Sequence, residues 1–217
     1  MLAGGYRRSP RWISRQLRTR PCLPRDIVNR RRYGPDGPLF AEAILVNPQE
    51  LRLSKRRVRQ SESATVVAGD WDAGEPRSPR DTPTFRALER RFFAGATWEE
   101  TGIIDKVWAW TEKHPGHNGC FTRQDIVNRY AQMDRLFEQA RSEGRLRWQH
   151  ELATPNFREY GGPLISITRD GRMVTSRESG NHRLAMALLL GLNAMPAQVG
   201  LVHRSVIHGW RDRCLSA

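Results

Sequence analysis

The segment from residue 164 to residue 202 most constrains the fold of this chain. "LISITRDGRMVTS" places Asp170-Gly171 between two runs of strand-forming residues, which is the pattern of a β-hairpin. Residues 181–190 follow as the most apolar helical stretch, with Gly191 just past its end. "PAQVGLV" at 196–202 is typical of a strand. A hairpin, a helix and a strand in close succession predict a small sheet with this helix packed on it.

Weaker patterns fill in the rest of the chain. Thr97 and Glu100 have the spacing of a capping box, and Thr122 is a good N-cap. Short strands are expected at 43–47 and 64–69, and helices at 84–95, 97–110, 122–145 and 205–215. This order predicts an α+β fold: a small mixed sheet with a helical insertion at about 83–150.

The net charge of +13 arises in two segments. Residues 1–34 hold ten Arg and one Asp, and residues 51–60 hold five basic residues and no acid. The remainder is nearly balanced, with 21 basic and 22 acidic residues. We therefore predict a basic, partly disordered arm over residues 1–38, with a short helix around Ile13–Leu17, and a folded domain over 39–217.

Clustered positive charge of this kind suits contact with the phosphates of DNA or RNA. The alternative is a solvated surface, because Arg outnumbers Lys 33 to 3 throughout and these segments lack the interleaved aromatic residues of a single-strand platform. The candidate nucleic-acid-binding residues are Arg30, Arg31, Arg32, Lys55, Arg56 and Arg57.

Composition also limits the location. No apolar run approaches the ~20 residues of a membrane span, so no membrane partner is expected. The start of the chain lacks an apolar signal segment, although its Arg-rich, acid-poor character is compatible with an organellar transit peptide. Three widely spaced cysteines argue against a disulfide framework. The predicted location is the cytoplasm.

The start of the apolar helix has the residues of an anion site. The first amides of a helix have no intrahelical partner and lie at the positive end of its dipole. Gly180 allows close backbone approach, His182 adds a titratable donor, and Arg183 adds a planar fork for phosphate oxygens. The alternative is a core helix with a polar start. The predicted phosphate-binding residues here are Ser179, Gly180, Asn181, His182 and Arg183.

Three further groups are candidates for the same site. Asp70 and Asp72 in "GDWD" follow a predicted strand, where Asp72 would bind Mg²⁺ or either carboxylate would act as a base. The alternative is a turn with Trp71 in the core. Glu178 precedes the phosphate loop directly and is a third catalytic candidate. His203 and Arg204 end the last strand, either as a second wall of the phosphate pocket or as an ordinary strand end.

"RDGRMVTSRESGNHRLAMALLLGLNAMPAQV" resembles the motif of the ParB/sulfiredoxin superfamily, in which a hairpin leads to G-x-x-R at a helix start and then to a Pro-led strand. "AILVNPQEL" is similar to the opening strand of ParB-like domains, and the layout is similar to uncharacterised ParB-like proteins of prokaryotes and phages. In this superfamily the loop binds nucleotide phosphates, of CTP in ParB and of ATP in sulfiredoxin and the free-serine kinases. The resemblance thus implies a nucleoside triphosphate (ATP or CTP) and Mg²⁺.

Departures from the motif narrow what the resemblance implies. Asn181 stands where sulfiredoxin has its catalytic cysteine, and no helix-turn-helix domain of the ParB kind follows residue 203. Only Gly180, His182 and Arg183 carry over as phosphate contacts. The expected function is nucleotide binding with Mg²⁺-assisted hydrolysis or phosphoryl transfer, and the alternative is a nucleic-acid-binding regulator or ParB-like nuclease that uses the Arg-rich arm. The sequence leaves the nucleotide and the oligomeric state open.

Overall fold

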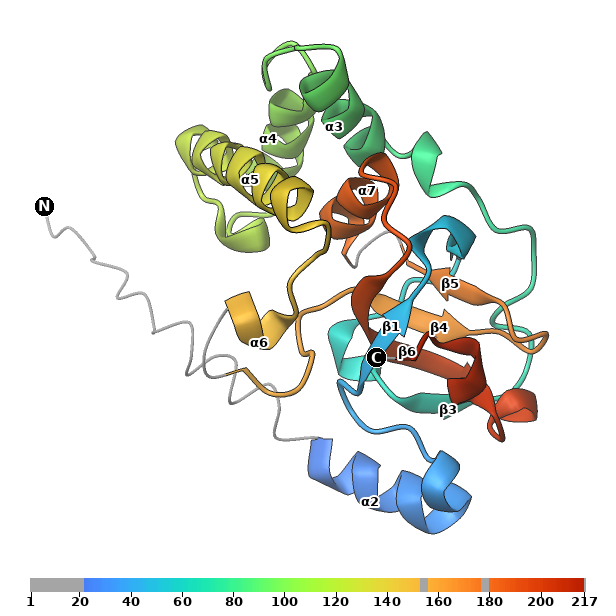
Figure 1. Ribbon diagram of the computed structural model, residues 1–217. Coiled ribbons are helices and arrows are strands. Elements are labelled where there is room, and N and C mark those ends of the chain that lie inside the picture. Colours follow the sequence, from blue (N-terminus) through green and yellow to red (C-terminus); the bar gives the residue numbers. More distant parts are fainter. Residues whose placement is uncertain (1–21, 153–155, 177–179, 217) are drawn as a thin grey trace, which may run out of the picture.

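The computed structural model describes residues 22–152, 156–176 and 180–216, and it has the predicted α+β fold (Figure 1). Six strands in these residues form one mixed sheet in the order β1-β6-β4-β5-β2, with β3 also paired to β6. The strands are β1 (Ala43–Val46), β2 (Arg52–Leu53), β3 (Thr65–Val67), β4 (Leu164–Ile167), β5 (Met173–Thr175) and β6 (Met195–His203).

Strand β6 is the centre of the sheet. All nine of its residues are buried, as expected for a strand covered on both faces. β1 pairs antiparallel with the first half of β6, while β3 pairs parallel with its last residues. β4 runs parallel to β6 on the other side and forms the predicted hairpin with β5.

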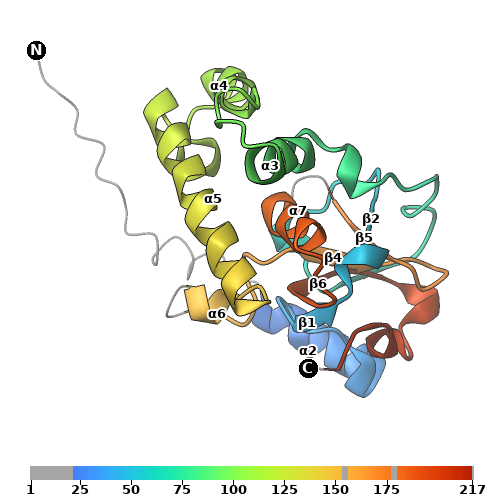
Figure 2. The ribbon, with the colours of Figure 1, turned by 45° about the horizontal axis from the view of Figure 1, so that its top comes forward.

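Helix α7 (Asn181–Leu189) packs against the sheet through a buried run, Leu184–Leu188. Three longer helices lie outside it: α3 (Pro83–Phe93), α4 (Ile103–Lys113) and α5 (Arg123–Glu143) (Figure 2). The short helix α6 (Gln149–Leu152) follows α5. The helices predicted within 83–150 are therefore present. No helix in the described ranges is long and apolar enough to cross a membrane.

The structure differs from the sequence-based predictions of the helices and strands in three places. The helix predicted at 97–110 begins only at Ile103, because Gly102 takes a left-handed φ of +73° and the Thr97–Glu100 hydrogen bonds close a separate turn. Residues 205–215 form two 3-10 turns, Arg204–Val206 and Trp210–Arg213, in place of a helix. Strand β2 was not predicted at all, since it lies inside a run of basic residues.

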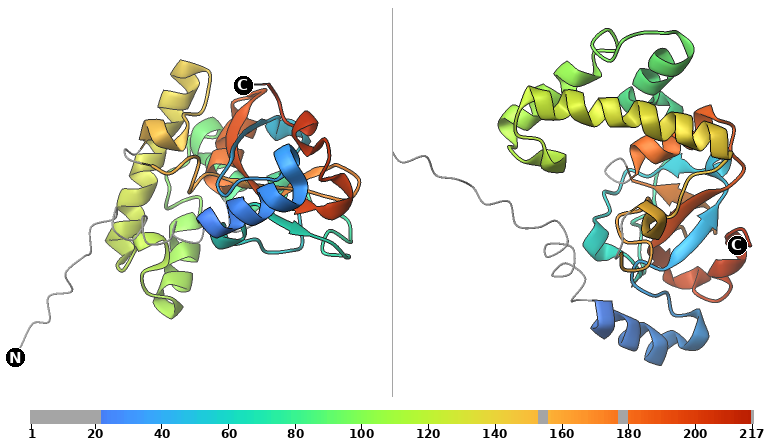
Figure 3. Two further views of the ribbon diagram at one scale, coloured as in Figure 1. Left: turned by 90° about the horizontal axis from the view of Figure 1, so that it is seen from below. Right: turned by 60° about the vertical axis from the view of Figure 1, so that its left-hand side comes forward.

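The largest correction concerns the predicted arm. Helix α2 (Cys22–Tyr33) lies within it and is part of the fold, at the end of the molecule away from α3, α4 and α5 (Figure 3). Asp26 is buried, accepts a hydrogen bond from the Phe40 amide at 2.6 Å and pairs with Arg158 at 2.8 Å. The boundary predicted at residue 38 therefore cuts through a packed unit. The helix predicted around Ile13–Leu17 lies outside the described residues.

We expect Asn29→Ala to destabilise the protein by about 1–3 kcal/mol, because two buried carbonyl oxygens lose their donor. The Asn29 side chain is buried and donates to the carbonyls of Pro38 and Ala64 at 2.7 and 2.8 Å. Arg31→Ala on the exposed face of α2 is the control and should change stability by less than about 0.5 kcal/mol. Urea unfolding measures both. Equal stability of the two variants would show that α2 is only loosely attached.

Candidate functional site

The sheet topology places the predicted site residues at two opposite edges. β3, β4 and β6 are parallel, so their carboxyl ends meet at one edge, which brings together Asp70–Asp72 after β3, Arg169 after β4 and His203 at the end of β6. β5 runs antiparallel to β4, so α7, which follows β5, begins at the other edge. The four residues of β4 separate the two edges, which corresponds to about 13 Å along the strand. The structure therefore does not bring His203 and Arg204 to the phosphate loop.

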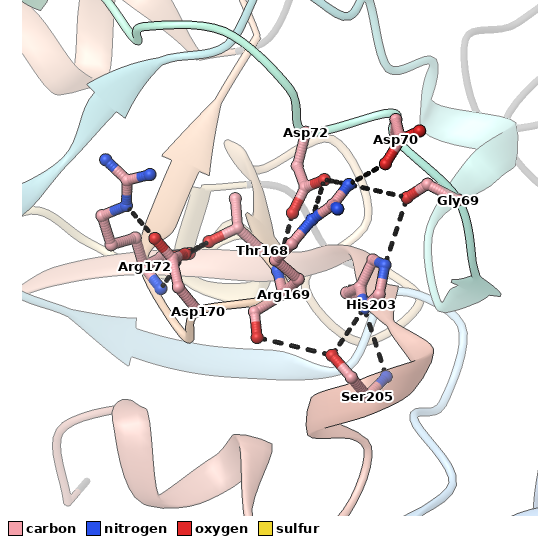
Figure 4. Close-up of polar contacts among 9 residues, drawn as sticks. All are labelled: Gly69, Asp70, Asp72, Thr168, Arg169, Asp170, Arg172, His203 and Ser205. Carbon is pink, nitrogen blue, oxygen red and sulfur yellow. Dashed lines mark hydrogen bonds and ion pairs between the residues drawn. The ribbon is translucent and has the colours of Figure 1, made fainter.

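An ion-pair cluster around Arg169 occupies the first edge (Figure 4). The Arg169 amide donates to Asp72 Oδ2 at 2.7 Å, and its guanidinium donates to Asp72 Oδ1 at 2.9 Å through Nε and at 2.6 Å through Nη2. The Asp72 side chain is 2% exposed, whereas that of Asp70, also paired to Arg169, is 81% exposed. Both oxygens of Asp72 are thus engaged by one arginine.

This arrangement does not fit the predicted Mg²⁺ site or the predicted general base. Mg²⁺ needs carboxylate oxygens that are open to it, and those of Asp72 hold Arg169 instead. Burial alone would raise the pKa of Asp72, but the hydrogen bonds and charge of Arg169 outweigh burial and lower it to about 2. A carboxylate this acidic is a poor base at neutral pH. No group of three metal-binding side chains occurs within the described residues.

His203 completes the same cluster. Its Nδ1 accepts the Ser205 amide proton at 3.2 Å, so Nε2 carries the ring proton and donates to the Gly69 carbonyl at 3.2 Å. The cavity nearest this cluster, beside Asp72, is about 10 Å³, enough for one water molecule at most. The cluster at the first edge therefore holds the ends of β3, β4 and β6 together. Trp71 packs beneath it, as in the turn alternative considered for "GDWD".

The second edge begins with Gly180, the N-cap of α7. It has a φ of +69°, and no side chain caps the helix among the described residues. A Cβ at this position would lie 2.5 Å from Pro163 Cβ. Glycine is therefore required here by backbone conformation and by contact with Pro163. Glu178 and Ser179, both predicted as site residues, lie outside the described residues.

His182 does not act as a cation at this edge. Its Nε2 lies 3.3 Å from the Tyr130 hydroxyl on α5, with the two ring centres 5.7 Å apart. Burial, with a smaller contribution from the charge of Arg129, lowers the pKa of His182 to about 4. The imidazole is thus neutral at pH 7. It joins α7 to α5 and supplies no charge to an anion.

Arg183 has the most unusual environment of the predicted residues. Its Nη2 donates to the Arg147 carbonyl at 2.5 Å, while its Nε is buried without an acceptor. Burial lowers the pKa of Arg183, against the longer-range attraction of Glu159 and Glu151. No carboxylate of the described ranges lies within ion-pair distance of it. Arg183 is therefore a partly buried cation that has no ion-pair partner among the described residues.

The basic segment 54–60 reaches the same edge. β2 runs parallel to β5, and the Ser54 amide donates to the Thr175 carbonyl at 2.8 Å. Ser176 Oγ donates to the Val58 carbonyl at 3.4 Å. Gln60, at the end of the segment, donates to the Gly162 carbonyl at 3.2 Å. Gly162 precedes Pro163, against which Gly180 lies. The backbone of residues 54–58 therefore lies beside the end of β5, which was missed together with β2. The Lys55 side chain turns toward Gly74 and lines the small cavity beside Asp72, and Arg56 pairs with Glu62 at 3.0 Å.

The other predicted nucleic-acid-binding residues lie on α2. Arg30, Arg31 and Arg32 form its last turn and are exposed. At the opposite end of this helix, the Arg25 guanidinium donates to the carbonyls of Ser61 and Ser63, both at 2.7 Å. Since residue 61 closely follows the basic segment 54–60, the two basic elements adjoin each other.

No protein-family model matches the chain, and neither the curated proteins nor the solved structures contain a significant match. The likeness to the ParB/sulfiredoxin superfamily therefore stays a prediction.

We expect Asp72→Asn to destabilise the protein at pH 7 by about 1–2 kcal/mol through loss of the charge-assisted bonds to Arg169, and the more exposed Asp70→Asn by less than about 0.5 kcal/mol. Asp72 has a folded-state pKa of about 2, below its unfolded value of about 3.9. Its contribution is therefore complete above pH ~5 and is lost as the pH falls toward 2. Urea unfolding between pH 2 and pH 7 should show the wild-type advantage shrinking below pH ~4, and a pH-independent difference would contradict this account.

Gly180→Ala and Gly191→Ala form a matched pair at the two ends of α7. Both glycines have positive φ, +69° and +65°, but only Gly180 has atoms where a Cβ would be placed. Each substitution strains the backbone by about 1 kcal/mol. Gly180→Ala should lower the free energy of unfolding by about 1–3 kcal/mol more, because its new Cβ would overlap with Pro163. Thermal unfolding compares them, and equal losses would mean that the Pro163 contact relaxes freely.

Proposed function

We propose that this protein binds a phosphate-bearing ligand at the edge of the sheet where α7 begins, and that the ligand belongs to the nucleotide class, with ATP and CTP as the first candidates. The observation that carries the proposal is the unneutralised charge of Arg183. A buried charge without a counter-charge is strongly unfavourable. An anion bound beside Arg183 would remove this penalty, and a planar guanidinium suits phosphate oxygens.

The start of α7 supports the same proposal. Gly180, the N-cap residue, has no side chain with which to cap the first turn of α7. The helix dipole adds the equivalent of about half a positive charge at this end. Backbone amides together with the dipole form a common phosphate site at helix N-termini.

The basic segment adds charge of the right sign. Arg57 is exposed on the segment that is bonded to the end of β5, where it adds positive charge at this edge. Exposed side chains of this kind raise the local concentration of an anionic ligand and speed its association. The residues at this edge bind and orient phosphate. Asp70 and Asp72, the predicted catalytic carboxylates, belong to the opposite edge, so no hydrolytic step is derived for them.

Nucleic-acid binding is the second candidate, favoured by the junction of α2 with the basic segment through Arg25. The exposed arginines of α2 and Lys55–Arg57 then provide an extended basic surface for the phosphates of DNA or RNA. Such binding weakens with salt, by a log–log slope of about −0.9 for each phosphate neutralised on duplex DNA.

We expect Arg183→Gln to weaken binding of the best nucleotide from an ATP, CTP, GTP and UTP panel by about 10–100-fold, since a charge-assisted pair typically contributes ~1.5–3 kcal/mol. Arg204→Gln is the matched control, because Arg204 is exposed at the opposite edge. It should leave the affinity within about twofold. Isothermal titration calorimetry measures all three proteins.

Unchanged affinity in Arg183→Gln, or absence of binding by every nucleotide, would contradict the first candidate. In the second case, duplex DNA binding that weakens in an Arg31→Ala/Arg32→Ala variant and with added salt would support the second candidate in its place.

A further inference from the structure

A cavity of about 120 Å³ lies between α5, α6 and α7, on the side of α7 where Arg183 projects. Its walls are mainly apolar and include Leu136, Leu146, Leu152 and Met186. This cavity is far larger than the one beside Asp72, and none of the predicted functions made use of it. Arg183 lines it and is the residue that links the cavity to the proposed phosphate site.

Three arginines line this cavity, and Arg183 is the one that has no ion-pair partner among the described residues. Arg145 and Arg147 also line it, but each is paired, with Glu151 at 2.7 Å and with Glu143 at 2.5 Å. These two arginines therefore bring no net charge. A ligand of the cavity meets one positive charge in a mainly apolar surrounding.

The nearby buried carboxyl group of Glu159 does not supply the missing anion. Its side chain is fully buried; Oε2 accepts the Gln149 amide proton at 2.9 Å, and Oε1 has no hydrogen-bond partner. Burial raises the pKa of Glu159, against the opposing effect of the Gln149 amide and of Arg183. Glu159 and Arg183 are not within ion-pair distance of each other, so Glu159 acts on Arg183 only through longer-range attraction.

The size and lining of the cavity restrict its occupant. An apolar cavity of ~150 Å³ holds one benzene molecule, so about 120 Å³ accepts a group of a single ring or smaller. Bare phosphate would leave the apolar walls without contacts. An apolar group carried close to an anion satisfies both the walls and Arg183.

We infer that the site also accepts small organic phosphates, in which a compact apolar group no larger than one ring occupies the cavity between α5, α6 and α7 while the phosphate contacts Arg183. The inference rests on the proposed function, because Arg183 is the anion contact in both. It adds a requirement that phosphate binding alone does not impose, namely discrimination by the organic part of the ligand.

Phenyl phosphate and inorganic phosphate are the probes, titrated calorimetrically into the full-length protein. We expect phenyl phosphate to bind at least tenfold more tightly. Ala140→Leu, which fills the cavity from α5, should abolish this preference and leave the affinity for inorganic phosphate within about twofold. Ala131→Leu, at an exposed position of the same helix, is the matched control and should retain the preference.

Leu152→Trp, at the partly exposed rim of the cavity, replaces Ala140→Leu if that variant does not fold. Equal affinity for the two probes, or a preference that survives in the cavity-filling variant, overturns this inference while phosphate binding stands. Failure of both probes and of every nucleotide overturns the proposed function together with it. If Arg183→Gln binds neither probe and the cavity-filling variant no longer prefers phenyl phosphate, the result supports both the proposed function and this inference.

Discussion

The pairing of β6 on both of its sides determines where chemistry can occur in this protein. β6 is parallel to β3 and β4, so their carboxyl ends coincide, while the β4–β5 hairpin returns the chain to the opposite edge before α7 begins. The residues around Asp72 and those around Gly180, which the sequence predicts as one site, are thereby held at opposite edges of the sheet. The topology alone rules out a single pocket that contains both Asp72 and Gly180.

The two edges differ in how well their charges are satisfied. At the first edge, Asp72 and Arg169 neutralise each other through three hydrogen bonds, and His203 is bonded through both ring nitrogens. A cluster satisfied to this degree stabilises and orients strand ends. At the second edge, Arg183 has a carbonyl partner and no anion among the described residues. That unmet electrostatic requirement is the reason why we propose a ligand site at the second edge.

Local patterns in the sequence were sufficient for much of the fold. The Asp170-Gly171 turn, the apolar run of α7 and the strand-forming run 196–202 of β6 each carry their signal within a few residues. Strand β2 lacks such a signal, because two residues in a basic run show no periodicity. Its position follows from pairing with β5, far along the chain.

The site was harder to predict for the same reason. Asp72 and Arg169 are separated by 97 positions, and nothing near either residue indicates their pairing. "GDWD" therefore has the composition of a metal site or of a general base, although both carboxylate oxygens of Asp72 are bonded to Arg169. The docking of α2 was missed because its high Arg content concealed Asp26 and Asn29, two of the residues that attach it to the body.

The Arg183 Nε–H group is the most direct probe of the central claim, that this guanidinium is the contact for a bound anion. Two-dimensional ¹H–¹⁵N NMR of the arginine Nε–H region, with the signal assigned by its loss in Arg183→Gln, follows this single group during titration with phenyl phosphate. We predict that the resonance shifts in the complex, because the guanidinium that carries this buried N–H group gains an anionic partner. A resonance that stays in place while the ligand binds would contradict the account.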